Sequence, residues 1–296
     1  MTEERRSFWT GIAEVVTGVL FFAPGAVFIK MAAGVTPLEI TLHRMAIAAI
    51  FILIYSKITK TDFMIKTRGE LFQFMCFGLI TAIHFGCFVT SLSYTKVSHS
   101  LALCYTAPIF SAITAAVFLK ETLNYIKICG IIVAVIGVTI LVGFEPGVNS
   151  KILFGDFLAL MSGMALGFYH TIGRFYKDRY NLFKYTGNMY IFAALYLFAG
   201  LIAARYSMPA QFSSVYSFNA AAGILCSVLF CTFLGHLLVN SALRKVKTVI
   251  VSLITTQEIT GGILFAWLFF SEPVSLNSIT GIIVSLAGIF TVIISK

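Results

Sequence analysis

Charged side chains are scarce in this chain. Only 11% of its 296 residues are Asp, Glu, Lys or Arg, whereas 59% are hydrophobic, and the mean hydropathy is +0.94. A soluble domain of this length carries about twice that charged fraction. The composition therefore excludes a water-soluble globular protein and indicates a chain that lies largely in a lipid bilayer.

Other absences narrow the function classes. The six cysteines include no CxxC pair and fall within apolar runs, so no structural disulfide is expected. No two histidines are spaced i, i+4, and no carboxylate stands beside them, so no metal site is expected. The chain also lacks HExxH, GxSxG and Asp-rich diphosphate motifs. We therefore predict no catalytic residues and no cofactor, and a membrane-embedded enzyme is a weaker alternative.

Long apolar stretches dominate what is present. A bilayer core roughly 30 Å thick needs about 20 apolar helical residues per crossing. No strand-like alternation of polar and apolar residues competes with this pattern. The sequence predicts an all-α integral membrane protein with ten transmembrane helices, at about 10–30, 37–55, 71–93, 97–119, 124–143, 154–173, 184–204, 218–242, 248–270 and 276–294.

The chain contains an internal repeat. Residues 118–142 reappear without a gap as residues 269–293, and the identical positions of the first copy are Phe118, Glu121, Ile128, Gly130, Ile131, Ile132, Val133 and Gly137. Five spans per repeat is an odd number, so the second repeat must enter the membrane in the opposite sense. The turn around Glu145-Pro146-Gly147 joins the halves, which we place at 1–147 and 148–296.

Basic residues indicate the orientation. With the N-terminus inside, 16 of the 21 Lys and Arg residues fall at cytoplasmic ends of spans, four fall at outer ends, and Arg44 lies within a span. This bias predicts that both termini are cytoplasmic. It also explains the net charge of +9, which is thus no evidence for nucleic-acid binding.

Arg5 and Arg6 precede a run that is too long for a cleaved signal peptide. We expect a multi-pass protein of a bacterial cell (inner) membrane.

Several motifs resemble those of a known family. They are Arg44 in span two, Tyr105-Thr-Ala-Pro108 in span four, Glu258 in span nine, and Phe270-Ser-Glu272 after it. Across essentially its whole length the chain resembles the ten-helix EamA-type transporters of the drug/metabolite transporter superfamily. The resemblance implies a substrate cavity among spans one, three, four, six, eight and nine, with alternating access. Such proteins commonly have Pro after the span-nine Glu. Here Ile259 follows, which removes the usual reason for a kink.

Small residues recur on one face of several spans. Glycines seven apart lie nearly two helical turns along the same face. Because helices in lipid associate by close backbone approach, such stripes indicate helix–helix packing. We assign this structural role to Gly130, Gly137, Gly163, Gly167, Gly281 and Gly288.

Charged groups inside spans are the first candidates for function. A carboxylate at the membrane centre costs about 2.5–3.5 kcal/mol on insertion scales, so Glu258 should face protein or water. A structural hydrogen bond at the repeat interface is favoured, and cation recognition or proton coupling is the alternative. Glu14 is interfacial or in the cavity. For Arg44, a fixed ion pair or a carbonyl clamp is favoured over substrate contact. Glu121 and Glu272 are interpreted as helix-end residues.

Buried imidazoles and aromatic side chains complete the candidate site. A histidine in a span can donate to a substrate carboxylate, titrate during transport, or satisfy a carbonyl, and aromatic walls suit flat rings or organic cations. His43 and His99 are expected to be structural or interfacial. The predicted substrate-binding set is Glu14, His84, Tyr105, Tyr169, His170, His236, Gln257 and Glu258.

Together these features predict a secondary transporter for small organic metabolites, with amino acids or related amines favoured. An exporter of organic cations or lipophilic drugs is the alternative, and a facilitative channel is the alternative of another class. Phosphorylated substrates are disfavoured because Arg44 is the only basic residue inside a span. The expected partners are the substrate, the lipid bilayer and a proton as a candidate coupling ion. The sequence does not specify the substrate, the direction of transport or the oligomeric state.

Overall fold

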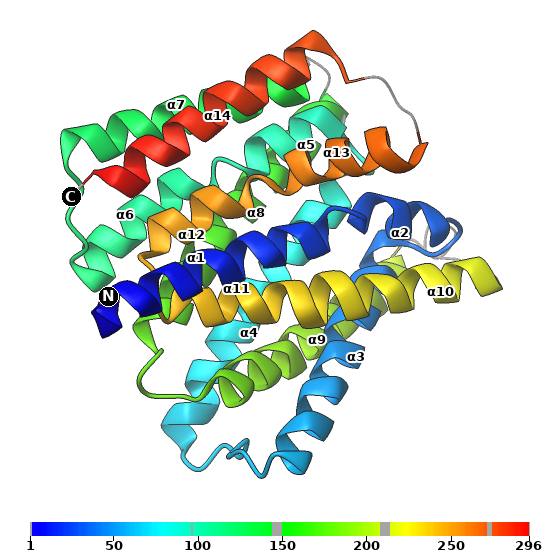
Figure 1. Cartoon of the computed structure of the whole chain (residues 1–296). Coiled ribbons are helices and arrows are strands. Elements are labelled where there is room, and N and C mark those ends of the chain that lie inside the picture. The colour runs from blue at the N-terminus through cyan, green and yellow to red at the C-terminus, as the bar shows by residue number, and fades with distance from the viewer. Residues whose placement is uncertain (1, 96, 144–149, 208–213, 271–273, 296) are drawn as a thin grey trace.

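Helices account for nearly all of the structure. The computed structural model describes residues 2–95, 97–143, 150–207, 214–270 and 274–295 (Figure 1). Within these ranges nine helical segments are long and apolar enough to cross a membrane, and the helix over Tyr125–Leu141 is a shorter tenth. The predicted all-α membrane fold is therefore confirmed. The proposed join at 147/148 and Glu272 lie outside the described residues.

Six of the ten spans are single helices and four are interrupted. The single helices are α3 (Pro37–Ile58), α4 (Arg68–Ser91), α7 (Tyr125–Val142), α8 (Ser150–Phe175), α9 (Leu182–Ser207) and α14 (Leu276–Ile294). Span one comprises α1 (Glu3–Phe22) and α2 (Gly25–Met31), and span four comprises α5 (Val97–Cys104) and α6 (Ala107–Leu119). Span eight comprises α10 (Phe218–Cys226), the π-helical η2 (Ser227–Gly235) and α11 (His236–Leu243), and span nine comprises α12 (Thr248–Thr255) and α13 (Glu258–Phe270).

The internal repeat is visible in the helix boundaries. Adding 151 to the bounds of α5 and α6 gives the bounds of α12 and α13: 97–104 becomes 248–255, and 107–119 becomes 258–270. The cap of the following helix obeys the same offset. Asn124 accepts from the Lys127 amide of α7 at 2.8 Å, and Ser275 accepts from the Ser278 amide of α14 at 3.1 Å. The last two spans of each repeat thus share helix starts and caps as well as residues.

Close packing of α7 against α14 joins the ends of the two repeats. The two helices run side by side in Figure 1. A Cβ added to Gly130 would lie 2.7 Å from Val292 Cγ2, and one added to Gly137 would lie 2.6 Å from the Ser285 Cα. Gly281 and Gly288 face the α7 backbone in the same way. Only glycine permits this approach, because any side chain would push the helices apart.

A second glycine pair packs span six against span four. A Cβ on Gly163 would lie 2.8 Å from the Cys104 carbonyl oxygen, and one on Gly167 would lie 2.8 Å from the Ser111 amide nitrogen. Gly163 therefore sits against the end of α5, where span four is interrupted. This contact fixes the interrupted part of span four against α8.

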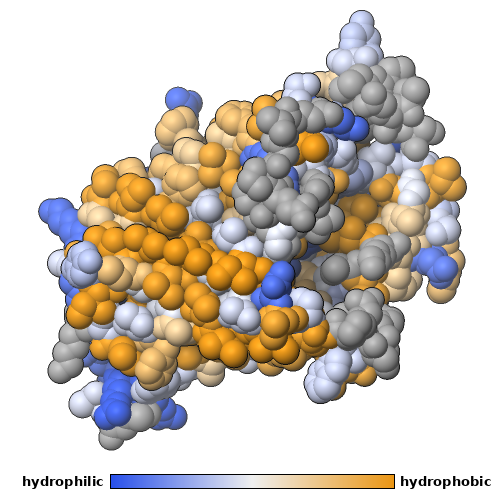
Figure 2. Space-filling view, turned by 90° about the horizontal axis from the view of Figure 1, so that it is seen from above, coloured by the Kyte–Doolittle hydropathy of each residue, from blue (hydrophilic) through white to orange (hydrophobic). Residues whose placement is uncertain are grey.

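The outer surface matches a bilayer environment. Figure 2 shows apolar side chains over the middle of one face and hydrophilic side chains at its left end. Large apolar residues such as Ile132, Ile136, Ile283 and Phe290 are exposed on α7 and α14. In Figure 1 both chain ends lie at the same end of the helix bundle, as an even number of crossings requires.

The glycine contact predicts an asymmetric effect of two identical substitutions. Gly137→Ala should destabilise the protein by about 1–3 kcal/mol, because the added methyl group overpacks the α7–α14 contact. Gly200→Ala on α9 has no atom within 4 Å of the new Cβ, so it should be neutral or stabilising by up to about 1 kcal/mol. Thermal unfolding of both variants in the same detergent checks this. Equal melting temperatures would contradict the packing role of Gly137.

Candidate substrate chamber

Spans four and nine are interrupted at equivalent positions. Tyr105 and Thr106 separate α5 from α6, and Thr256 and Gln257 separate α12 from α13. The backbone keeps its hydrogen bonds there through tight turns, with Thr106 N donating to Leu103 O at 3.2 Å and Gln257 N to Ile254 O at 3.0 Å. Inside a membrane such irregular backbone is tolerated only where protein or a polar cavity surrounds it. Span nine is interrupted although no proline follows Glu258.

A hydrogen bond connects the two interruptions. The Tyr105 hydroxyl donates to Glu258 Oε2 at 2.8 Å, and only 6% of Tyr105 is exposed. Tyr105 stands just after α5 and Glu258 is the first residue of α13. The bond therefore joins the first repeat to the second at the point where each has lost its regular helix.

These groups line a cavity of about 190 Å³. Five predicted substrate residues face it, namely His84, Tyr105, His170, His236 and Glu258. The rest of the wall includes Arg44, Ser227 and Thr255, together with the aromatic rings of Phe22, Phe85 and Phe88. The lining comes from spans one, two, three, four, six, eight and nine. Span two is the addition to the expected set, and it contributes Arg44.

The three histidines of the cavity differ in their partners. His84 Nδ1 lies 2.9 Å from Ser162 Oγ, and that hydroxyl donates to the His84 carbonyl at 2.8 Å. The Nδ1 atoms of His170 and His236 are buried without a hydrogen-bond partner among the described residues. Buried polar atoms are normally paired, so these two nitrogens are the ones that an incoming ligand could satisfy.

Arg44 contributes a positive charge to the cavity. Its Nε donates to Thr232 Oγ1 of η2 at 3.0 Å, and its guanidinium lies 5.5 Å from the centre of the Phe85 ring. The charge acts electrostatically on Glu258 and His84. In the part of the chain that the structure describes, Arg44 has no carboxylate within ion-pair distance. From the sequence, an ion pair or a carbonyl clamp is expected for Arg44. The structure instead shows the Thr232 hydroxyl as the partner of its guanidinium.

Three predicted substrate residues lie elsewhere. Glu14 forms an ion pair with Lys245 near the end that carries the chain termini. The Tyr169 hydroxyl accepts from Asn240 Nδ2 at 2.8 Å, directly behind the cavity wall. Gln257 donates to Ser285 Oγ at 3.0 Å, and it faces α14. The sequence assigned these residues to their spans but did not reveal which helix face they occupy.

Other polar residues are held by neighbours outside the cavity. His43 Nδ1 lies 2.6 Å from the Glu39 carbonyl, His99 Nδ1 lies 3.2 Å from Asp156 Oδ1, and Glu121 pairs with Arg174 at 3.0 Å. The described residues contain no group of three His, Cys, Asp or Glu side chains that could hold a metal ion. The lining of the cavity offers charge, hydrogen-bonding groups and aromatic surface to a ligand.

Known proteins resemble the chain in both repeats. Residues 9–143 and residues 153–294 each match the EamA-like transporter family. An uncharacterized transporter of Archaeoglobus fulgidus is 28% identical over 192 residues, which are 63% of this chain. The match spans 64% of that relative, somewhat less than two thirds of its length. The uncharacterized transporter YyaM of Bacillus subtilis is 24% identical over 255 residues, which are 84% of this chain and 81% of YyaM.

A solved crystal structure shares the architecture. It covers 97% of this chain and 96% of its own with a TM-score of 0.79, at 12% sequence identity. This likeness shows the fold alone. Both sequence relatives are named as uncharacterized transporters.

The bond between the interruptions predicts energetic coupling. In a double-mutant cycle of Tyr105→Phe and Glu258→Gln, the interaction energy should be about 0.5–3 kcal/mol, because the two side chains are in direct contact. The matched cycle uses Tyr206→Phe, since Tyr206 is 91% exposed, and should give less than about 0.5 kcal/mol. Thermal or denaturant unfolding in detergent supplies the free energies. Additive effects of Tyr105→Phe and Glu258→Gln would contradict the contact.

Proposed function

Because the chain belongs to the EamA-like transporter family, we propose that it is a secondary transporter that moves small organic metabolites by alternating access. Amino acids or related amines are the favoured substrate class. The observation that carries this proposal is the cavity lined by spans four and nine, whose interruptions are joined by the Tyr105–Glu258 hydrogen bond. In inverted-repeat transporters, substrate sites lie at the repeat interface and are built from discontinuous helices.

The two ends of the bundle differ in a way that suits alternating access. The cavity reaches Leu92, which follows α4, and Leu101 on α5, toward the end away from the termini. At the other end, ion pairs join Arg174 to Glu121 and Lys245 to Glu14, linking span six to span four and span eight to span one. Opening toward that second end requires these pairs to separate while the outer parts of the helices close.

The charges of the cavity favour a zwitterionic substrate. Glu258 can accept hydrogen bonds from an amine, and Arg44 with the free imidazole nitrogens can bind a carboxylate. Both signs of charge occur within about 190 Å³. Cavities for drug-sized ligands are typically about 300–1,000 Å³, so the volume favours a small metabolite over a large lipophilic cation.

Titratable groups in the same cavity make a proton the candidate coupling ion. Glu258, His170 and His236 can each change charge, and each lies where a bound substrate would touch it. A proton taken up by one of them alters the charge that the substrate meets, which couples the two bindings. From the positive-inside bias we propose that both termini are cytoplasmic. We also propose 147/148 as the boundary between the two repeats.

Transport assays in liposomes test this assignment. Purified protein should take up a responsive amino acid or amine. Glu258→Gln and His84→Ala should each lower uptake at least about tenfold, the effect of losing about 1.4 kcal/mol of substrate binding, while the purified variants remain folded. Removing the charge or the imidazole takes away a group that contacts substrate, so binding and turnover both fall. Asp178→Asn and His43→Ala, which alter a carboxylate and a histidine outside the cavity, are the matched controls.

Two results would reject the proposal. Normal uptake in both Glu258→Gln and His84→Ala would show that the cavity is not the substrate site. Flux that rises in proportion to substrate concentration without saturating would indicate a channel in place of a transporter.

A further inference from the structure

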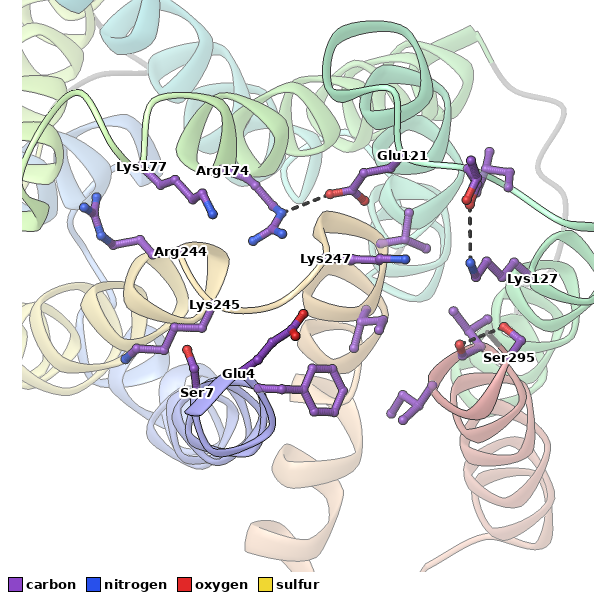
Figure 3. A pocket seen from close by; sticks show the side chains of 17 residues that line it. Glu4, Ser7, Glu121, Lys127, Arg174, Lys177, Arg244, Lys245, Lys247 and Ser295 are labelled. Atoms are coloured by element: carbon purple, nitrogen blue, oxygen red, sulfur yellow. Dashed lines mark hydrogen bonds and ion pairs between the residues drawn. The ribbon is translucent and has the colours of Figure 1, made fainter. Parts of the chain in front are cut away.

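A second cavity of about 440 Å³ lies at the end of the bundle where both termini are found (Figure 3). Spans from both repeats contribute to it. Two carboxylates, Glu4 and Glu121, line this cavity against six cations, namely Lys127, Arg174, Lys177, Arg244, Lys245 and Lys247. We call it the basic cavity. The positive-inside bias explains why this end of the protein is basic, but it does not require six cations to line one cavity.

Internal partners neutralise only part of this charge. Arg174 pairs with Glu121, and Lys245 pairs with Glu14. Lys177 lies 4.0 Å from Asp178, whose carboxylate side chain is 89% exposed to solvent. Lys247 forms no ion pair within the described ranges, and its charge repels that of Lys127. An anion placed among these groups would relieve this repulsion.

An apolar groove continues from the basic cavity along the side of the protein. It measures about 640 Å³ and lies on α1, on α14, and on α12 with α13. Ile293 lines both the cavity and the groove. On two further helices a cavity residue stands one turn before a groove residue: Phe8 before Ile12, and Ile250 before Ile254. We call this surface the lateral groove. It begins at the basic end and runs toward the middle of the membrane.

We propose that the basic cavity and the lateral groove together bind one anionic phospholipid. The phosphate would lie near Lys177 and Lys247, and an acyl chain would lie along the groove. Phosphate oxygens form strong charge-assisted hydrogen bonds with lysine and arginine, and basic pockets between cytoplasmic helix ends suit anionic headgroups. A free phosphate ion would use the cavity alone, so the adjoining groove is what favours a lipid. Bound there, the lipid would bridge α1 of the first repeat and α14 of the second.

Lipid addition to the purified protein tests the site. In a neutral detergent, phosphatidylglycerol should raise the melting temperature and remain bound in native mass spectra, because a ligand of the folded form stabilises it. Phosphatidylcholine with the same acyl chains should do neither. Inorganic phosphate at matched ionic strength should give a much smaller shift, because it cannot occupy the groove.

Charge and groove variants identify the location. Lys177→Gln/Lys247→Gln should weaken phosphatidylglycerol binding roughly thirtyfold, since each cation beside an anionic headgroup contributes about a factor of five. The matched control, Lys57→Gln/Arg68→Gln, removes two exposed cations outside the cavity and should leave binding unchanged.

The groove has its own pair of variants. Ala287→Trp places an indole in the lateral groove and should reduce lipid retention. The control is Ala199→Trp, at an exposed position of α9 outside the groove. It should leave lipid retention unchanged.

Three outcomes would overturn the proposal. One is equal stabilisation by phosphatidylcholine and phosphatidylglycerol. Another is an equal loss of binding in both double-glutamine variants, which would show a general attraction to the basic end. The third is a full effect of inorganic phosphate that Ala287→Trp does not change, which would identify a phosphate-ion site. None of these outcomes bears on uptake through the central cavity, so the transport proposal is tested separately.

Discussion

A bilayer offers the peptide backbone no hydrogen-bond partners, and this constraint determines where the chain can depart from regular helix. The departures at Tyr105–Thr106 and Thr256–Gln257 occur where the two repeats meet, and tight turns satisfy their amides. The Tyr105–Glu258 hydrogen bond then joins them. Because the interruptions leave a gap in the packing, polar side chains can gather there without facing lipid. The cavity is thus a consequence of where the helices break.

Two polar regions follow from this arrangement, and they have different chemistry. The central cavity combines Glu258 with Arg44, so it contains charges of both signs in a small volume. The basic cavity is dominated by cations and opens toward an apolar groove. The first suits a small molecule that carries both an amine and a carboxylate. The second suits an anion with a hydrocarbon chain, and it lies beside the Arg174–Glu121 and Lys245–Glu14 ion pairs.

The sequence predicted the fold well because its signals are local and repeated. The expected span 124–143 corresponds to α7 at Tyr125–Val142, and the offset of the internal repeat recurs in the helix boundaries. The glycines were identifiable because spacing along one helix face is enough to indicate close packing. The length of an apolar run, the capping residues and the spacing of glycines each depend only on one helix and the helix packed next to it.

The site was less predictable because it depends on which way each helix faces. Gln257 and Glu258 are adjacent, yet the first faces α14 and the second lines the cavity. Ile259 gave no sign of the interruption in span nine. The π-helical stretch Ser227–Gly235 changes the angular position of the residues after it and places Thr232 against Arg44. No periodicity in the sequence marks that stretch.

Thiol accessibility at the two ends of the transport path tests alternating access most directly. The background is a protein whose six native cysteines are replaced. In it, Leu92→Cys reports on the outer end of the central cavity, and Ile250→Cys reports on the end of the bundle that contains the basic cavity. When a substrate is added, labelling should fall at one position and rise at the other, because only one end is open at a time. Labelling that rises at both positions together would indicate a continuous pore and contradict the mechanism.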